Sequence, residues 1–346
     1  MNAHSRQLRL ILPVLSLIAT ASFAGPRTSL AQGKPAAVGT VERLDPRFDA
    51  LVPPGAVVER IGEGYDWSEG PVWDRRNACL YFSDVPQNKI YKWQEGKGVS
   101  VYLEPSGYTG ATPRGGEPGS NGLLIDEQGR LLLCQHGDRK VARLEPNKSF
   151  KTIAGGYMNK RFNSPNDLVL KSNGDIYFTD PPYGLIGLNN SPNKEIPFNG
   201  VYRISANDGS VTLLTKELTF PNGLAFSPDE KSLYVANSDP KKAIWMAFPV
   251  KDDGTLGEGR VFADVTSSVA SKKGLPDGMK VDEKGNLFAT GPGGVLVFAP
   301  DGAHLGTFAT GEATGNCCFG EDGDTLFITA DMYLGRVKLL TKGKVR

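Results

Sequence analysis

Short apolar segments alternate with polar turns along most of the chain, and residues 70–103 show this pattern most clearly. Within the segment 89–93, Lys-Ile-Tyr-Lys-Trp, polar and apolar side chains alternate with a period of two. Such alternation between turn signals is typical of antiparallel β-strands. The predicted strands in this stretch are 70–74, 79–84, 89–93 and 99–103. Because no long stretch combines helical periodicity with helix caps, we predict an all-β chain.

The same four-strand unit occurs six times along the chain. Each copy begins at one aligned position, which a glycine usually follows, and the positions are Glu69, Asn121, Asn166, Asn222, Asp277 and Gly315. The intervals between them are 52, 45, 56, 55 and 38 residues, which bracket the period of a propeller blade. We therefore predict a six-bladed β-propeller of four-stranded antiparallel blades around a central axis, over residues 49–346. A strand near 57–61 is expected to close the ring beside 336–340.

The first 31 residues are predicted to be a signal peptide, and residues 32–48 a linker. Arg6 and Arg9 form a basic start, and the stretch 10–24 is largely apolar, with suitable cleavage sites at residues 22–24 and 29–31. A membrane anchor is the competing interpretation. The apolar run is shorter than the ~20 residues of a spanning helix, and Pro13 interrupts it. We expect an exported protein, periplasmic or secreted, without stable membrane insertion after cleavage.

Charge and cysteine content narrow the possible functions. The chain has 39 Lys and Arg against 38 Asp and Glu, so no basic surplus favours nucleic-acid binding. Its four cysteines, at 79, 134, 317 and 318, lie in apolar strand segments, where cysteine usually behaves as a small buried side chain. We expect neither a disulfide framework nor a cysteine metal site. The neighbours Cys317 and Cys318 should point to opposite faces of one strand.

The six aligned positions should ring the propeller axis, because every first strand begins at the same end of its blade. Glu69 and Asp277 bring carboxylates to this ring, and three asparagines bring amide oxygens. Hard oxygen donors suit Ca²⁺, or Mg²⁺ or Mn²⁺, better than a soft metal. Asn-Gly and Asp-Gly are also common turn dipeptides, which is enough to explain any single copy. Six copies in register favour a metal site.

Several motifs resemble gluconolactonases of the senescence-marker-protein/regucalcin-like superfamily, over about residues 55–340. They occur in the family's order as Glu69-Gly-Pro-Val-Trp, Asn163-Ser-Pro-Asn-Asp-Leu168, Phe178-Thr-Asp-Pro-Pro-Tyr-Gly-Leu185, Phe220-Pro-Asn-Gly-Leu224 and Pro276-Asp-Gly-Met279. The resemblance implies a propeller with a divalent metal on its axis, usually Ca²⁺, although Mg²⁺, Mn²⁺ or Zn²⁺ are alternatives. It implies that Glu69, Asn222 and Asp277 are metal ligands. Asn166 matches a further metal-proximal or substrate-binding position, and we include it in the metal set.

The resemblance also implies a mechanism. The cation would polarise the carbonyl of a sugar lactone, and Asp277 would activate a water molecule as general base. An ion-bound hydroxide is the alternative base, because the cation lowers the basicity of a carboxylate that it binds. Three residues on the same rim are predicted to contact the substrate: Asn121, His136 and Tyr183. The structural alternatives are a strand-end hydrogen bond for His136 and simple packing for Tyr183.

The predicted function is therefore metal-dependent hydrolysis of a sugar lactone such as gluconolactone. One alternative is hydrolysis of another lactone, an ester or an organophosphate at the same site. A second is a non-enzymatic propeller whose rim binds a carbohydrate or a protein. No Gly-x-Ser-x-Gly elbow and no phosphate-binding Gly-Lys-Ser/Thr loop occurs in the sequence, which disfavours serine catalysis and nucleotide hydrolysis. Specificity is expected in the long loops 104–120 and 180–200. The oligomeric state stays open.

Overall fold

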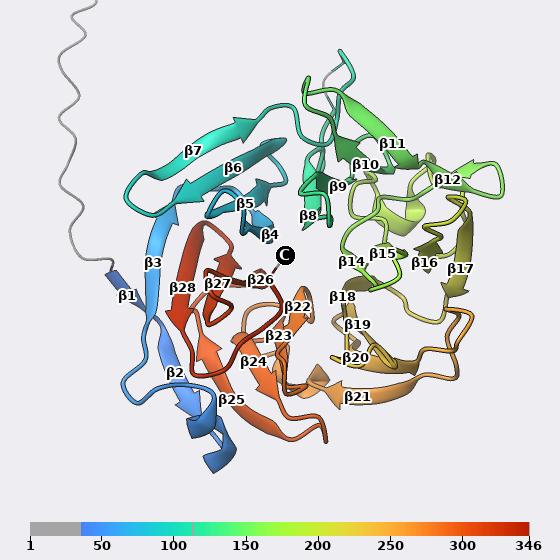
Figure 1. The fold of residues 1–346 in the computed structure, drawn as a ribbon. Coiled ribbons are helices and arrows are strands. Elements are labelled where there is room, and N and C mark those ends of the chain that lie inside the picture. Colours follow the sequence, from blue (N-terminus) through green and yellow to red (C-terminus); the bar gives the residue numbers. More distant parts are fainter. Residues whose placement is uncertain (1–35, 113, 346) are drawn as a thin grey trace, which may run out of the picture. The chain divides into compact units, whose positions relative to one another are not determined.

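In the computed structural model, antiparallel sheets stand around a central axis and form a ring (Figure 1). The structure describes residues 36–112 and 114–345, so the predicted signal peptide, residues 1–31, lies outside the described residues. Within these ranges six sheets have four or five strands each, and this confirms the predicted six-bladed β-propeller. No helix in the described ranges has the length and apolar character needed to cross a membrane.

Within each blade the strands follow one another outward from the axis (Figure 1). The innermost strands are β4 (Ser68–Asp74), β8 (Ser120–Ile125), β14 (Leu168–Leu170), β18 (Pro221–Phe226), β22 (Met279–Val281) and β26 (Thr314–Gly320). The second strands are β5 (Cys79–Asp84), β9 (Leu131–Gln135), β15 (Ile176–Asp180), β19 (Ser232–Asp239), β23 (Leu287–Gly291) and β27 (Thr325–Ala330).

The outer half of each blade is built in the same way. The third strands are β6 (Lys89–Gln94), β10 (Lys140–Leu144), β16 (Gly200–Ile204), β20 (Lys242–Pro249), β24 (Gly294–Phe298) and β28 (Tyr333–Lys338). The fourth strands of the first five blades are β7 (Gly98–Leu103), β11 (Phe150–Ala154), β17 (Val211–Thr215), β21 (Arg260–Asp264) and β25 (His304–Ala309). A small hairpin of β12 (Gly156–Tyr157) and β13 (Lys160–Arg161) and the short 3₁₀ helices η2 (Leu188–Asn190) and η3 (Thr266–Ser268) lie in the connections.

The last blade takes its outer strand from the beginning of the chain. β3 (Val58–Glu63) pairs antiparallel with β28, and Glu59 lies opposite Arg336 in the register. The guanidinium Nε of Arg336 is also 2.9 Å from Oε2 of Glu59. The predicted closure is therefore confirmed, and the ring is sealed by ordinary ladder hydrogen bonds rather than left with two open edges.

Residues 36–48, which we assigned to a linker, are instead part of the propeller. β1 (Ala36–Val38) pairs with β3, β2 (Thr40–Arg43) pairs with β25, and the 3₁₀ helix η1 (Pro46–Ala50) follows. The Phe48 side chain is completely buried, and its ring centroid is 5.7 Å from that of Phe308. The sequence shows no clear period here because these edge strands leave most of their side chains exposed.

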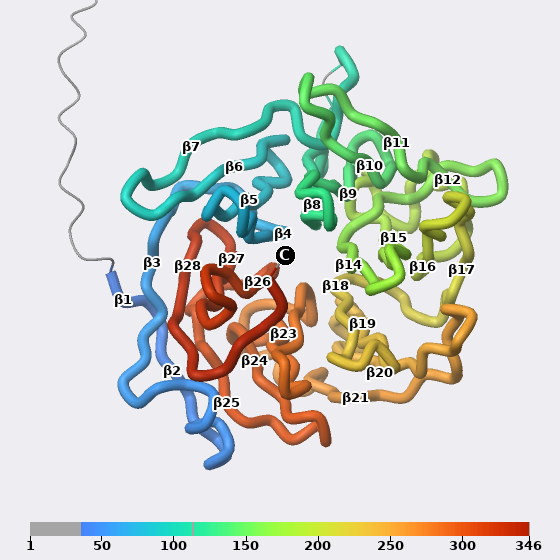
Figure 2. The backbone as a smooth tube through the Cα atoms, viewed as in Figure 1, coloured from blue at the N-terminus to red at the C-terminus, as the bar shows by residue number. Residues whose placement is uncertain are grey.

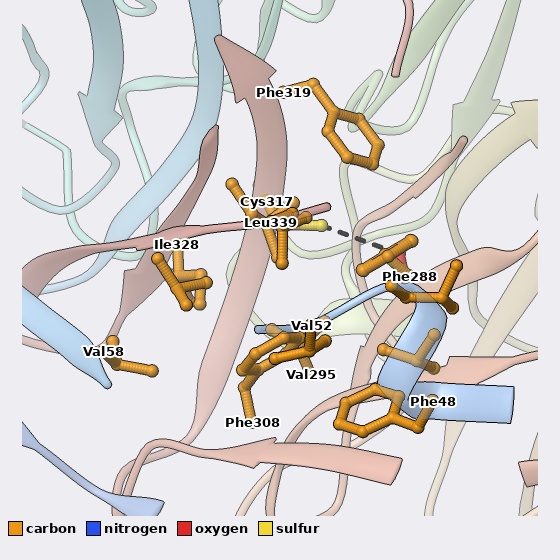
Figure 3. Close-up of a cluster of buried hydrophobic side chains, with 14 of the residues drawn as sticks. Phe48, Val52, Val58, Phe288, Val295, Phe308, Cys317, Phe319, Ile328 and Leu339 are labelled. Atoms are coloured by element: carbon orange, nitrogen blue, oxygen red, sulfur yellow. Dashed lines mark hydrogen bonds between the residues drawn. The ribbon is translucent and has the colours of Figure 1, made fainter. Parts of the chain in front are cut away.

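The apolar core is divided among the contacts between neighbouring blades. Six clusters of buried side chains are found among the described residues, and each joins two adjacent blades. Figure 3 shows the cluster between the fifth and sixth blades, where Cys317 Sγ lies 3.6 Å from the carbonyl oxygen of Phe288. Cys318 belongs to the cluster on the other face of the same blade. This confirms the predicted opposite orientation, and all four cysteines are free and buried.

Candidate functional site

The six aligned positions lie where the innermost strands begin. Glu69, Asn121, Asn222 and Gly315 are on β4, β8, β18 and β26, and Asn166 and Asp277 lie two residues before β14 and β22. In four blades the ladder register breaks at this point, as it does between Glu69 and Val72. Bulges of this kind change the direction of a side chain and are common beside active sites. The strand geometry therefore aims these residues toward the axis.

Close contact between blades explains the glycine that usually follows the aligned position. A β-carbon on Gly122 would lie 2.7 Å from the carbonyl oxygen of Asn166, and one on Gly70 would lie 2.0 Å from that of Asn121. Among the described glycines 70, 122, 223 and 278, only Gly70 has a positive φ, of 48°. The dipeptides are therefore required mainly where two blades touch, and not as left-handed turns.

Replacing Gly70 with alanine should destabilise the protein by about 3 kcal/mol or more, because the new methyl group would meet neighbouring backbone as well as an unfavourable φ. Gly55→Ala is a matched control, since Gly55 also has a positive φ, of 72°, but a β-carbon added there would have no neighbour within 4 Å. It should cost about 1 kcal/mol. Urea unfolding of both variants measures the difference, and equal losses would contradict close packing of the ring.

Glu69 and Asp277 place two repelling carboxyl groups beside the axis. Glu69 is only 1% exposed, and burial together with the nearby Asp167 carboxylate raises the pKa of Glu69 to about 8. Asp277 is half-buried, yet the protein crowds its carboxyl group, so desolvation and then the charge of Glu69 raise the pKa of Asp277 well above its usual range. A divalent cation at this place would offset both the desolvation and the repulsion.

Two ring asparagines contribute amide oxygens without partners. Nδ2 of Asn222 donates to Oγ of Ser238 at 2.9 Å, and Nδ2 of Asn166 is 3.4 Å from Nε2 of His136. The Oδ1 atoms of both asparagines are buried and accept no hydrogen bond. A buried amide oxygen without a partner is costly, and a cation is a partner that it can take together with nearby carboxylates. The residues present therefore fit a bound divalent cation.

The side chains proposed to hold the cation offer only oxygen donors. Over residues 36–112 and 114–345, no cluster of three or more His, Cys, Asp or Glu side chains is arranged to hold a metal ion. The candidate set combines two carboxylates with two amide oxygens: Glu69, Asp277, Asn166 and Asn222. Such an all-oxygen set matches the preference of Ca²⁺ and lacks the sulfur and imidazole donors that favour zinc.

Sequence reasoning missed a third acidic residue at the ring, Asp167. This residue is 3% exposed, Leu168 N donates to its Oδ1 at 2.8 Å, and Asn316 Nδ2 lies 3.3 Å from its Oδ2. The Asp167 carboxylate acts on both Glu69 and Asp277 and raises the pKa of each. The available signal was that Asp167 stands where the other copies mostly have glycine.

Tyr183 and Asn121, two of the residues predicted to contact a substrate, lie beside the ring, and the substrate contact itself stays a prediction. Tyr183 is half-buried and its ring stacks with that of Phe220 at a centroid distance of 5.8 Å. Burial and the negative charge of Asp277 raise the pKa of the Tyr183 hydroxyl, so it remains a hydrogen-bond donor at neutral pH. Asn121 is 4% exposed, and its backbone carbonyl accepts a hydrogen bond from Ser83 Oγ at 2.8 Å.

His136, the third predicted substrate contact, is completely buried. Its Nε2 faces the amide of Asn166, and its Nδ1 lies 3.2 Å from Oε2 of Glu117, a residue of the loop 104–119. The contact between Nδ1 and Glu117 has the distance of a hydrogen bond but not its angles, so Nδ1 has no hydrogen-bond partner among the described residues. Glu117 is a further residue that sequence reasoning missed, since its contact depends on how the loop folds.

Residues at the ends of the second strands hold the segments that lead into the ring. Both carboxylate oxygens of Asp180 accept backbone hydrogen bonds at 2.8 Å, from Asn163 N and Ser164 N. Asp84 does the same in the first blade for Asp66 N and Trp67 N, at 3.2 Å each. These carboxylates therefore have structural partners, although burial raises the pKa of Asp180 to about 7.

The ring and the two long loops lie at one end of the propeller. Arg114 of the first loop donates to the carbonyl oxygens of Gly137 and Gly184, and so joins this loop to the second. A largely apolar cavity of about 400 Å³ is lined by the later residues of the innermost strands and by Val345. The C-terminal end of the chain lies near the axis (Figure 2). None of Glu69, Asn166, Asn222 or Asp277 lines this cavity, so the polar site is separate from it.

Comparison with known proteins gives one family over most of the chain. The model described as "SMP-30/Gluconolactonase/LRE-like region" matches residues 67–331. A gluconolactonase of Zymomonas mobilis is 39% identical over 341 residues, which cover 96% of each chain. The pentonolactonase XacC of Haloferax volcanii is 26% identical, over 75% of this chain and 80% of its own.

A solved structure shares both fold and sequence. The structure of a gluconolactonase from Xanthomonas campestris superposes with a TM-score of 0.77 at 32% identity, and covers 89% of this chain and 98% of its own. The similarity therefore extends over most of the ring of blades that carries the aligned polar positions.

Proposed function

The chain belongs to the SMP-30/gluconolactonase/LRE-like family and is a lactone-hydrolysing enzyme, and we propose that it hydrolyses a sugar lactone at the axial ring with the help of a divalent cation. The observation that carries this proposal is the meeting of two repelling carboxyl groups, Glu69 and Asp277, with two unpartnered amide oxygens. Similarity to gluconolactonases makes an aldonolactone such as gluconolactone the first substrate to test.

Glu69, Asn166, Asn222 and Asp277 are the residues proposed to hold the cation, and Ca²⁺ fits their oxygen donors best. When bound, the cation supplies Lewis-acid polarisation of the lactone carbonyl. Glu69 is nearly inaccessible and accepts the backbone N–H of Gly70 at 2.7 Å, so its role is to bind. Asp277 is only partly buried, so its carboxylate can meet a water molecule as well.

We assign the proton transfer to Asp277. The water oxygen forms a bond to the carbonyl carbon while a water proton passes to the Asp277 carboxylate. The bond between this carbon and the ring oxygen then breaks, and the ring oxygen takes the proton held by Asp277 to become the hydroxyl of the open-chain acid, which returns Asp277 to its carboxylate form. One lactone and one water thus give one hydroxy acid.

Tyr183 and Asn121 are proposed to position the sugar. The Tyr183 hydroxyl stays protonated because burial and the charge of the nearby Asp277 raise its pKa. It can therefore donate a hydrogen bond to a substrate oxygen beside the reacting carbonyl. The Asn121 amide can pair with a sugar hydroxyl, because an amide offers both a donor and an acceptor. Neither residue needs to change its protonation state during hydrolysis.

Removal of the cation should lower lactone hydrolysis by roughly 100-fold or more, because Lewis-acid stabilisation is worth several kcal/mol. The test is titration of the acid released from gluconolactone, a pentonolactone and an aliphatic lactone by purified protein, before and after treatment with a chelator. Added Ca²⁺ should restore the rate. Equal activity of treated and reloaded protein would contradict a cation-dependent reaction, and faster turnover of aryl esters or organophosphates would change the substrate class.

A further inference from the structure

The two ring asparagines are held by residues that occupy equivalent places in different blades. Strand register aligns Gln135 with Asn237 as the partners of Ser120 and Pro221, so His136 and Ser238 are the next residues in each blade. Ser238 holds the amide nitrogen of Asn222, and His136 faces that of Asn166. In both cases the amide oxygen is left free of hydrogen bonds. Residues at equivalent places in two blades thus contact the amide nitrogen of a proposed ligand and leave its amide oxygen free.

The charge beside His136 favours one of its two tautomers. Glu117 Oε2 is 3.2 Å from Nδ1, and although the angles there do not make a hydrogen bond, a carboxylate this close attracts a proton to that nitrogen. Nε2 is then a hydrogen-bond acceptor. It can accept from the amide NH₂ of Asn166 but not from the amide oxygen, which has no proton to donate. The oxygen of Asn166 is consequently directed away from the histidine. His136 is completely buried, and the ring residue that its Nε2 faces is Asn166.

The loop 104–119 holds Glu117 in place through its backbone. The carbonyl oxygens of Gly119 and Pro118 accept hydrogen bonds from His136 N and Gly137 N, at 3.1 and 3.2 Å. Arg114 of the same loop donates to the carbonyl oxygen of Gly137 at 2.9 Å. These contacts hold the loop on both sides of Glu117 in sequence and place its 37% exposed carboxylate beside the histidine.

We propose that Glu117 and His136 are positioning residues that fix the Asn166 amide with its oxygen toward the cation. This inference rests on the proposed function, because it assigns the oxygen of Asn166 to the cation. An asparagine amide can rotate by half a turn at little cost unless a neighbour distinguishes its two ends. Without the pair, the amide would present an NH₂ group where the cation requires an oxygen.

The test is a double-mutant cycle read out as Ca²⁺ affinity. Isothermal titration of Ca²⁺ into chelator-treated protein compares wild type, Glu117→Ala, His136→Phe and the double variant. We expect each single change to weaken binding by about tenfold or more, as loss of an outer-shell partner usually does. The double variant should bind no more weakly than His136→Phe, because Glu117 acts through His136.

A control at the start of the same loop separates this effect from loss of a surface charge. Glu104→Ala removes a carboxylate that lies 3.7 Å from Lys89 instead, and it should leave Ca²⁺ affinity within about twofold of wild type. If the losses of Ca²⁺ affinity added up in the double variant, or if Glu117→Ala bound Ca²⁺ as wild type does, the positioning role would be overturned and the proposed function would stand. A wild-type protein that binds no Ca²⁺ would overturn both this role and the cation of the proposed function. Glu117 is at the surface, so its variant tests the idea even if His136→Phe fails to fold.

Discussion

Asp277→Asn should lower kcat for lactone hydrolysis by a factor of about 1,000, within the range that loss of a general base produces. Asparagine has nearly the same shape and retains an oxygen that can face the cation, but it cannot accept a proton from water. Because the carboxyl group of Asp277 is crowded by protein and repelled by Glu69, the substitution also relieves an electrostatic cost in the metal-free protein. A loss of stability is therefore not expected to explain the loss of rate.

The measurement is steady-state hydrolysis of gluconolactone at several Ca²⁺ concentrations up to saturation. Saturation matters because Asp277 is also a proposed ligand, and its loss should weaken Ca²⁺ binding as well as remove the base. Asp252→Asn, at an exposed position, is the matched control and should keep the wild-type rate. If Ca²⁺ at saturation returned Asp277→Asn to near the wild-type kcat, Asp277 would be a ligand only.

The blades could be predicted from the sequence because their signals are local. A four-stranded blade is built from neighbouring segments, so alternation and turn residues mark it without knowledge of distant contacts. Ring closure could be expected because a ring of blades has to be closed and the strand near residues 57–61 comes before the first repeat, and this strand does pair with β28. Residues 36–48 were assigned wrongly since edge strands with exposed side chains carry little periodic signal. Their one completely buried aromatic, Phe48, is visible only in the packed structure.

The site could be predicted only as far as the repeat defines it. Registering the copies placed Glu69 and Asp277 at one axis, because strand direction fixes where every first strand begins. The contacts that prepare those residues cross between blades and loops, and therefore have no local signal. Glu117 meets His136 only because the loop 104–119 folds back onto residues 136–138, which follow β9, and Asn316 reaches Asp167 from another blade. The glycines illustrate the same limit. A glycine in the sequence can mark a tight turn or a close approach of two blades, and the sequence alone does not distinguish the two.

Glu69→Gln should make the metal-free protein more stable and at the same time nearly abolish stabilisation by Ca²⁺. The pKa of Glu69 is raised to about 8 by burial and by the Asp167 carboxylate. A carboxyl group with a raised pKa contributes stability below its ordinary pKa near 4.5, and this contribution is lost as the pH rises through about 8. Glutamine stays neutral and can still accept the N–H of Gly70, so at pH 8 the metal-free variant should gain on the order of 3 kcal/mol.

Thermal unfolding with chelator or with Ca²⁺, at pH 5 and at pH 8, separates the two effects. Metal-free wild type should melt lower at pH 8 than metal-free Glu69→Gln, and the two should approach each other at pH 5, where Glu69 is protonated. Ca²⁺ at about 100 times its dissociation constant should stabilise wild type by about 2.7 kcal/mol, but should shift the variant little. Glu127→Gln, at an exposed turn, serves as the control. Equal Ca²⁺ stabilisation of wild type and Glu69→Gln would exclude Glu69 as a ligand. If the gain in stability of metal-free Glu69→Gln over metal-free wild type were the same at pH 5 and pH 8, the buried charge of Glu69 would not be what destabilises the metal-free protein.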